Sequence, residues 1–113
     1  MQNTSLYKKI NNLLNNFIKT YNKKYRINYF ELVKWFTGSN QKQHIDLDYH
    51  PYTSIIYLNN NYEGGETVVA NEVINPKKGK LISFEGNKIF HKVNKVTKGI
   101  RYTLPCWYTN ESN

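Results

Sequence analysis

The sequence predicts a mainly β domain with one helix at its N-terminal end, arranged as a sandwich or barrel, of which the jelly roll is one form. Three observations support this fold class. The chain has 113 residues, which is the size of a single domain. Residues 1–27 carry the pattern of a supporting helix, and residues 28–109 carry a series of short apolar segments separated by turn signals.

The N-terminal segment has the spacing of an amphipathic helix. Its apolar side chains recur three or four residues apart, and Asn and Lys fill most positions between them. The apolar positions are Leu6, Ile10, Leu13, Leu14, Phe17, Ile18 and Tyr21. We expect this helix to pack against the sheet, although a helix lying on a membrane surface would show a similar pattern.

The pattern changes to short β segments from residue 28. The expected strands span residues 30–36, 41–47, 54–58, 66–70, 80–84, 89–93 and 100–108. Turn signals that contain Gly, Asn or Pro separate them at residues 38–40, 59–61, 64–65, 76–79, 86–87 and 98–99. Several short strands at such spacing are typical of sandwiches and barrels.

The chain is strongly basic, with 16 Lys and Arg against 8 Asp and Glu and a formal net charge of +8. One interpretation is a surface for a polyanion, because clustered basic side chains neutralise phosphates. The other is AT-rich codon usage, which supplies Lys, Asn, Ile and Tyr and is common in large viruses, phages and parasites. The second fits better, because the lysines are spread along the chain and only clustering makes a strong electrostatic surface.

Cysteine content and the N-terminal segment indicate the compartment. A single cysteine, Cys106, excludes an intramolecular disulfide and suits a reducing environment. Residues 1–24 lack an apolar run of signal-peptide length, and no stretch approaches the length of a membrane span. We therefore expect a soluble protein of the cytoplasm, that of a host cell if the source is a virus or phage, without a membrane partner.

Residues 43–50 are the densest cluster of metal-ligating side-chain types. Side chains two residues apart on a strand point to the same face, so His44 and Asp46 would present an imidazole and a carboxylate together. His91 could add a second imidazole from a separate strand. Such a set leaves open metal positions and suits non-haem Fe(II) oxygenases, but His-x-Asp alone also occurs on ordinary surface strands.

Arg101 is the second residue that suggests a site. It lies ten residues after His91 and follows the turn at residues 98–99, and a hairpin of this length can return the chain to the same face. A guanidinium binds a carboxylate through two parallel hydrogen bonds, which lysine does less well. An ordinary surface ion pair would account for this arginine equally well.

Six motifs occur in a fixed order along residues 35–108. They are His44-x-Asp46, Ile55-Ile56-Tyr57-Leu58-Asn59, Tyr62-Glu63-Gly64-Gly65-Glu66-Thr67, Pro76-x-x-Gly79-x-Leu81-x-x-Phe84, His91-x-Val93 and Gly99-x-Arg101-Tyr102-x-Leu104-x-x-Trp107. In this order they resemble the catalytic domain of 2-oxoglutarate- and Fe(II)-dependent dioxygenases, in the prolyl 4-hydroxylase-like branch. The six together are far more specific than any one motif.

The resemblance implies a double-stranded β-helix, a relative of the jelly-roll and cupin folds. It implies an Fe(II) ion on His44, Asp46 and His91, which would form the catalytic metal site. It also implies 2-oxoglutarate and O2 as cosubstrates, with ascorbate as a further cofactor in this class of enzyme.

The resemblance also suggests how 2-oxoglutarate would bind. Its distal carboxylate would lie on Arg101, and Tyr57 corresponds to the family's hydroxyl partner of that carboxylate. Thr103 lies two residues from Arg101, so it shares the strand face and could assist. Phe84 and Trp107 are expected in the core more than in the site.

Two further residues compete as metal ligands. Asp48 and His50 fall on the same face as His44 if that strand continues. The family spacing selects Asp46 instead and leaves His50 as a pocket or loop residue.

The implied reaction is hydroxylation of a C–H bond. A prolyl residue of a peptide or protein is the first expectation for the substrate, while lysyl residues, other protein side chains and small molecules stay open. The chain is short for this family, so we expect an open site or one that a partner completes.

Two other functions compete with the oxygenase. A catalytically silent jelly-roll module would bind a ligand or protein but would lack a metal ligand or the arginine, and all four residues are present here. A nucleic-acid-binding module would stack bases on aromatic side chains gathered on one face. The tyrosines here are scattered, so we do not expect nucleic acid as a partner.

Overall fold

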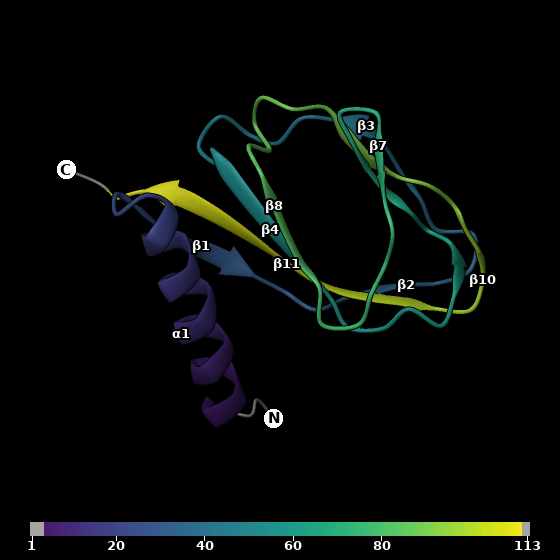
Figure 1. The fold of residues 1–113 in the computed structure, drawn as a ribbon, viewed down its shortest axis with the longest axis horizontal. Helices are drawn as coiled ribbons and strands as arrows, with labels where there is room; N and C mark the ends of the chain where they lie inside the picture. Colours follow the sequence, from purple (N-terminus) through teal and green to yellow (C-terminus); the bar gives the residue numbers. More distant parts are fainter. Residues whose placement is uncertain (1–3, 112–113) are drawn as a thin grey trace.

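The computed structural model describes residues 4–111, which form one helix and eleven strands (Figure 1). The elements are α1 (Thr4–Tyr21), β1 (Tyr25–Phe30), β2 (Val33–Trp35), β3 (Gln41–His44), β4 (Tyr52–Tyr57), β5 (Glu63–Gly64), β6 (Thr67–Val69), β7 (Glu72–Ile74), β8 (Leu81–Phe84), β9 (His91–Val93), β10 (Val96–Lys98) and β11 (Arg101–Asn110). The predicted mainly β fold with an N-terminal helix is confirmed. The helix is not long and apolar enough to cross a membrane.

The described strands form two main antiparallel sheets. One has the order β1-β11-β4-β8, with β2 paired beside β1 along the same edge of β11, and the other has the order β3-β9-β6-β7. The short strands β10 and β5 form a separate pair. The two main sheets face each other as in a jelly roll, and α1 packs at one end of the five-stranded sheet, away from β3 and β7 (Figure 1).

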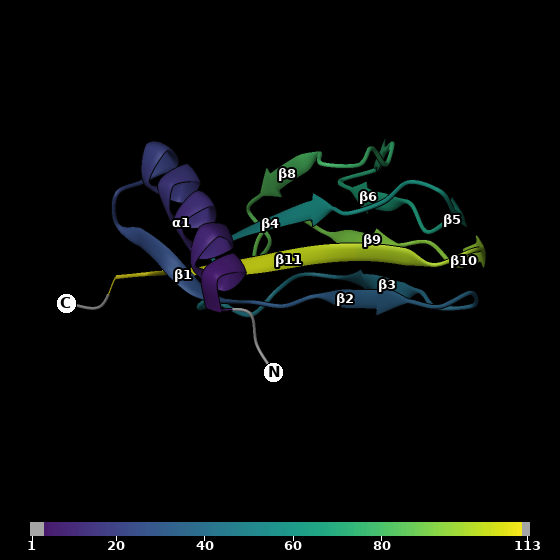
Figure 2. The same ribbon diagram turned by 90° about the horizontal axis from the view of Figure 1, so that it is seen from below.

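Strand β11 separates the helix-packed core from the space between the sheets. It runs lengthwise through the molecule, with β4 along one edge and β2 along the other (Figure 2). Side chains alternate along a strand. Leu104, Cys106 and Tyr108 therefore join the buried core with Leu14, Ile18 and Tyr52, whereas Arg101, Thr103, Pro105 and Trp107 line a pocket on the opposite face.

The helical region is shorter than predicted. We expected helix through residue 27, but α1 ends at Tyr21 and residues 25–27 already pair with the end of β11. The side chain of Asn22 accepts a hydrogen bond from the Lys24 amide at 2.9 Å, and its carbonyl accepts one from the Tyr25 amide at 3.1 Å. Such a local turn competes with helix continuation.

The strand predictions were right in type and less accurate in extent. The segment predicted at residues 30–36 is divided between β1 and β2, and β3 ends at His44 instead of continuing to residue 47. Strands β5, β7 and β10 were not predicted. The β6–β7 hairpin turns through Ala70 and Asn71 with φ of 49° and 72°, a two-residue turn that an Ala-Asn pair does not signal.

The core thiol provides a first testable prediction. Cys106 is a free cysteine with no exposed surface, and burial raises the pKa of its thiol from 9.0 to about 12. Because the thiolate is the nucleophile, we expect iodoacetamide at pH 8.5 to react about a thousand-fold more slowly than with an ordinary thiol. Mass spectrometry should show fast labelling only in denaturant; fast labelling of the native protein would contradict this packing.

Candidate functional site

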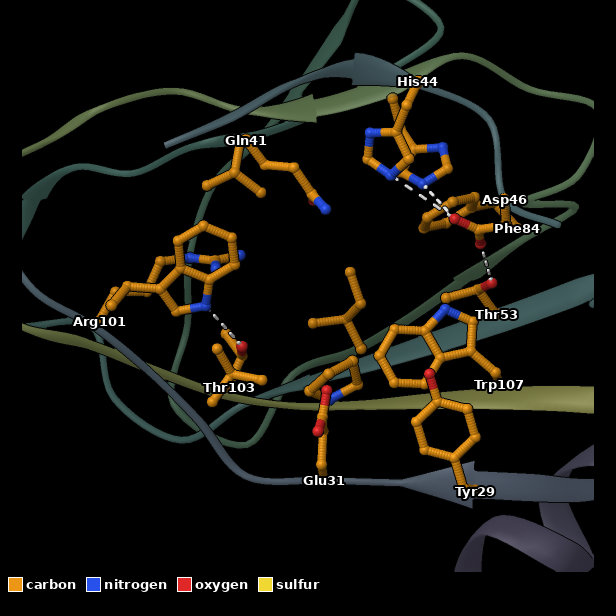
Figure 3. A pocket seen from close by; sticks show the side chains of 16 residues that line it. Tyr29, Glu31, Gln41, His44, Asp46, Thr53, Phe84, Arg101, Thr103 and Trp107 are labelled. Atoms are coloured by element: carbon orange, nitrogen blue, oxygen red, sulfur yellow. Dashed lines mark hydrogen bonds and ion pairs between the residues drawn. The ribbon is translucent and has the colours of Figure 1, made fainter. Parts of the chain in front are cut away.

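A pocket of about 350 Å³ lies between the two main sheets (Figure 3). Its lining includes Thr53 and Ile55 from β4 and the pocket-facing residues of β11, together with Gln41, His44 and His91 from the opposite sheet. Figure 3 shows Arg101 at one end and the group of His44 and Asp46 at the other. Of the predicted site residues, all but Tyr57 therefore line one pocket.

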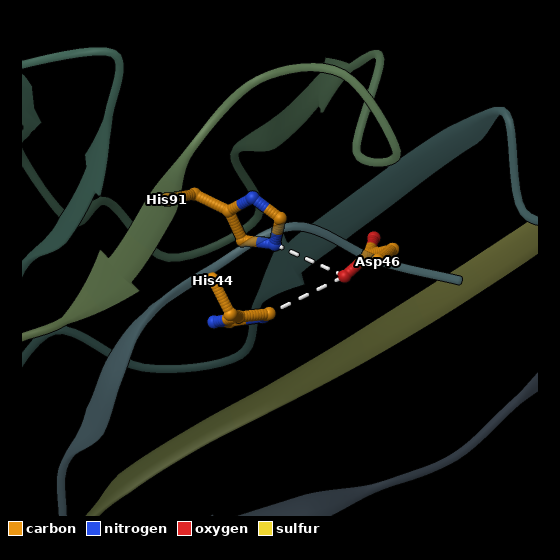
Figure 4. Close-up of side chains that lie close together, drawn as sticks. All are labelled: His44, Asp46 and His91. Carbon is orange, nitrogen blue, oxygen red and sulfur yellow. Dashed lines mark hydrogen bonds and ion pairs between the residues drawn. The ribbon is translucent and has the colours of Figure 1, made fainter. Parts of the chain in front are cut away.

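His44, Asp46 and His91 form the only potential metal-ligand group found among residues 4–111, and their ligand atoms all lie within 4.8 Å of one another (Figure 4). Asp46 Oδ1 lies 3.1 Å from His91 Nε2 and 3.6 Å from His44 Nε2. His44 and His91 are direct cross-strand partners in the β3–β9 ladder, with ring centroids 4.2 Å apart. Cross-strand pairing thus brings together two imidazoles that are 47 residues apart in the sequence.

Asp46 reaches this group in a different way from that predicted. Strand β3 ends at His44, so regular strand alternation does not extend to Asp46. Instead, the Asp46 amide donates a hydrogen bond to the Gly86 carbonyl at 2.8 Å, and Asp46 Oδ2 accepts one from the Thr53 hydroxyl at 2.6 Å. Contacts with the other sheet and with the segment after β8 therefore place this carboxylate.

Hydrogen bonds fix the orientation of both imidazoles. His44 Nδ1 lies 2.8 Å from the Lys42 carbonyl, and His91 Nδ1 lies 2.8 Å from the Ile89 carbonyl. A carbonyl only accepts, so each Nδ1 carries a hydrogen and donates it. Each Nε2 then faces Asp46 Oδ1, and in a neutral ring it carries the lone pair that a metal needs. The two-nitrogen, one-oxygen set fits Fe(II).

The pKa values of Asp46 and His91 shift in opposite directions. Burial would raise the pKa of Asp46, but hydrogen bonds from His91 and Thr53 and the nearby imidazoles lower it. Burial would lower the pKa of His91, but its hydrogen bonds to Asp46 and the Ile89 carbonyl raise it. Both shifts arise from the contact between the carboxylate and the imidazole, and metal binding there would require His91 Nε2 to be free of its proton.

The rival ligands lie apart from this group. His50 is only 3% exposed, and its Nε2 lies 2.9 Å from Asn28 Oδ1. Asp48 is exposed in the turn after Asp46. The assignment of Asp48 and His50 as ligands assumed a strand that continues past residue 46, but β3 ends at His44.

Arg101 is a buried cation that forms no ion pair within residues 4–111. It is 1% exposed, and its guanidinium carbon lies 4.7 Å from the ring centroid of Trp35, its cross-strand partner. Nη2 donates to the Thr67 hydroxyl at 2.9 Å. No carboxylate of the described residues pairs with Arg101, and its Nε is buried without a hydrogen-bond partner there.

Thr103 lines the pocket with Arg101, whereas Tyr57 is buried behind the lining, with its ring centroid 5.7 Å from the guanidinium carbon of Arg101. The Tyr57 hydroxyl is 2.6 Å from Thr67 Oγ1, and Trp35 Nε1 donates to the Thr103 hydroxyl at 3.3 Å. Sequence reasoning did not assign roles to Thr67 and Trp35. Thr67 ends the Gly-Gly-Glu-Thr motif, and the signal for Trp35 was only its place at the start of the matching region.

Phe84 and Trp107, which we expected mainly in the core, both line the pocket. The Phe84 ring meets His91 edge-on with centroids 4.7 Å apart, and Trp107 stacks on Tyr29 with centroids 4.6 Å apart. Each belongs to an apolar strand, and the face to which it points depends on strand register.

The sequence model described as the 2OG-Fe(II) oxygenase superfamily matches residues 30–109, a range that includes His44, Asp46, His91 and Arg101. The chain belongs to this superfamily. The resemblance deduced from the six motifs is therefore confirmed.

The curated relatives of this superfamily member include prolyl 3-hydroxylases. Human prolyl 3-hydroxylase 2 is 38% identical over a 71-residue alignment that covers 54% of this chain and 10% of the relative. Mouse prolyl 3-hydroxylase 3 is 31% identical over 83 residues, covering 65% of this chain and 11% of the relative. The chain thus spans about a tenth of the length of the curated relatives it matches.

Solved structures share the fold. A 2OG-Fe(II) oxygenase family oxidoreductase from Burkholderia pseudomallei superposes with a TM-score of 0.79 at 23% identity, covering 94% of this chain and 58% of that one. The viral collagen prolyl hydroxylase of Paramecium bursaria Chlorella virus-1 gives a TM-score of 0.75 at 23% identity, covering 95% and 72%. The predicted jelly-roll architecture is confirmed.

Proposed function

We propose that this chain is a 2-oxoglutarate- and Fe(II)-dependent hydroxylase that acts on a prolyl residue of a peptide or protein. One observation carries the proposal. A two-histidine, one-carboxylate group and a buried arginine that meets no carboxylate of residues 4–111 line the same pocket from opposite ends.

His44, Asp46 and His91 would hold the metal. Bound Fe(II) with open coordination positions supplies the O2-dependent oxidation of a C–H bond, coupled to decarboxylation of 2-oxoglutarate. The protein contributes orientation: backbone carbonyls turn both imidazoles toward the carboxylate, and β-sheet register holds the two rings side by side.

Arg101 would bind the distal carboxylate of 2-oxoglutarate. A buried charge without a partner is strongly unfavourable, so a guanidinium left unpaired at the end of a pocket favours an anionic ligand. Arg101 Nε is buried without a hydrogen-bond partner among the described residues and is a free donor in this region. The hydroxyls of Tyr57, Thr67 and Thr103 would surround the same carboxylate.

The prolyl substrate is supported by the relatives and by the pocket wall. The curated relatives are named prolyl 3-hydroxylases, and the structural neighbours include a prolyl-4-hydroxylase from Pseudomonas putida. Tyr29 and Trp107 stack along one wall of the pocket, and such an aromatic surface suits the apolar proline ring. Ascorbate would act as a supporting reductant in this reaction class.

An anaerobic titration of the metal-free protein with Fe(II) and 2-oxoglutarate tests this function. We expect the weak visible charge-transfer band of an Fe(II)–2-oxoglutarate chelate, followed by succinate formation when O2 and proline-containing peptides are added. Absence of the band, with Fe(II) shown not to bind, would instead favour a catalytically silent jelly-roll module. A band without peptide turnover would redirect the search to lysyl residues, other side chains or small molecules.

Tyr57 offers a more graded test of cosubstrate binding. Tyr57→Phe removes only the hydroxyl that pairs with Thr67 at 2.6 Å. A neutral hydrogen bond contributes about 0.5–1.5 kcal/mol, so the 2-oxoglutarate concentration giving half of the charge-transfer signal should rise roughly two- to tenfold. The exposed Tyr49 supplies the control Tyr49→Phe. An unchanged titration for Tyr57→Phe would exclude this hydroxyl from binding.

A further inference from the structure

The two carboxylate oxygens of Asp46 have different surroundings. Oδ1 faces the imidazoles of His44 and His91, at 3.6 and 3.1 Å from their Nε2 atoms (Figure 4). Oδ2 points away from them and accepts the Thr53 hydroxyl at 2.6 Å (Figure 3). The same carboxylate therefore presents one oxygen to the candidate metal site and one to the protein.

Gly86 closes the space on the protein side of this carboxylate. A Cβ added at Gly86 would lie 2.1 Å from Asp46 Oδ2 and 2.5 Å from Thr53 Oγ1. Both distances are far below van der Waals contact, so any side chain at this position would displace the Asp46–Thr53 pair. The Gly86 carbonyl also accepts the Asp46 amide at 2.8 Å, which joins the two backbones at this point.

Glycine is required at residue 86 for space and not for backbone conformation. The chain has six glycines, and the other five have φ between 64° and 96°, the left-handed region that favours glycine. Gly86 lies outside that region. An alanine is therefore compatible with its backbone, and the only obstacle is the contact with Asp46 and Thr53.

We propose that Thr53 and Gly86 are positioning residues that make Asp46 a one-oxygen metal ligand, an inference that rests on the proposed Fe(II) function. The Thr53 hydroxyl occupies Oδ2 by hydrogen bonding, and Gly86 allows the carboxylate to lie against the backbone. Oδ1 alone then remains for the metal. A carboxylate that bound through both oxygens would take up a position that the cosubstrates need.

The contacts that Thr53 and Gly86 make with Asp46, here called the carboxylate clamp, are supported by the sheet. Thr53 is 3% exposed and lies in β4, where it pairs with Phe84 of β8, two residues before Gly86. Two adjacent strands of the five-stranded sheet thus support a ligand that follows β3 of the opposite sheet. Thr53 and Gly86 are both buried, so the side of Asp46 that faces them is turned away from solvent.

Co(II) titration of three variants tests the clamp without relying on turnover. Thr53→Val keeps the shape and removes the hydroxyl, Thr53→Ser keeps the hydroxyl, and Gly86→Ala adds one methyl group. We expect Thr53→Val and Gly86→Ala to weaken Co(II) binding roughly 10- to 100-fold, the range for partners that orient a metal ligand. Thr53→Val should also change the visible Co(II) spectrum, and Thr53→Ser should restore both spectrum and affinity.

Calorimetry of Co(II) binding and thermal melting of each metal-free variant separate positioning from general stability. Ser54→Ala is the matched control, because this neighbouring buried hydroxyl instead bonds to Ser83 and Tyr108. Equal affinity and an identical Co(II) spectrum for Thr53→Val and the wild type would overturn the clamp while leaving the proposed function intact. Failure of the wild-type protein to bind either Co(II) or Fe(II) would overturn the proposed function and the clamp with it.

Discussion

Loss of Fe(II) binding is the expected result of the substitution His91→Ala. His91 is 7% exposed, lies in β9 between β3 and β6, and presents Nε2 at 3.1 Å from Asp46 Oδ1. No other histidine can replace it, because the third histidine of the chain, His50, is bonded to Asn28. Removing a partner that only orients a ligand weakens metal binding 10- to 100-fold, so removing a ligand should weaken it by at least about 100-fold.

His50 provides the matched control for this experiment. His50→Gln keeps a side chain able to donate a hydrogen bond to Asn28 and should leave Fe(II) binding close to that of the wild type. Both variants can be titrated anaerobically by calorimetry. If His50→Gln lost the metal while His91→Ala retained it, the rival ligand set would be correct and the assignment of His91 would be wrong.

Weaker binding of 2-oxoglutarate, with little change in Fe(II) binding, is the expected result of the substitution Arg101→Met. Hydrogen bonds to charged groups contribute about 1.5–3 kcal/mol, so 2-oxoglutarate should bind the Fe(II)-loaded variant roughly 10- to 150-fold more weakly. Fe(II) binding itself should change little, because Arg101 lies at the far end of the pocket from the metal-ligand group (Figure 3). The charge-transfer band measured against 2-oxoglutarate concentration gives the affinity.

Thermal melting of the Arg101→Met variant tests whether Arg101 has a purely structural role. Arg101 is buried with no carboxylate partner among the described residues, so an apolar methionine of similar length should leave the melting temperature of the metal-free protein unchanged or raise it. Arg26, the only other arginine, is exposed and supplies the control Arg26→Met. A large drop in melting temperature together with unaltered 2-oxoglutarate affinity would show that Arg101 is structural.

The candidate metal group could be predicted from the sequence because metal ligands are recognised by residue type and spacing. His44-x-Asp46 and the distant His91 have the residue types and order of a facial triad, and ordered motifs around them narrowed the family. The reason given for Asp46 was only partly right. Strand alternation predicted that His44 and Asp46 point together, but the strand ends at His44, and Thr53 and the Gly86 backbone position the carboxylate.

The residues that sequence reasoning missed depend on contacts across strands. Thr67 bridges Tyr57 and Arg101, and Trp35 stacks on Arg101 as its partner in the β2–β11 ladder. Neither residue type signals such a role alone. Threonine and tryptophan are ordinary strand residues, and only register determines which of them meet the guanidinium.

The sequence by itself determined the helix, most strands, the family and the residue types of the candidate ligand set. Hydrophobic periodicity and ligand type are local or ordered along the chain, so they can be read without coordinates. The tertiary structure alone decided the depth at which Arg101 is buried, the split environment of Asp46 and the space that Gly86 must leave empty. These properties arise where residues far apart in sequence pack together, and close packing in three dimensions leaves no signal in the order of residues.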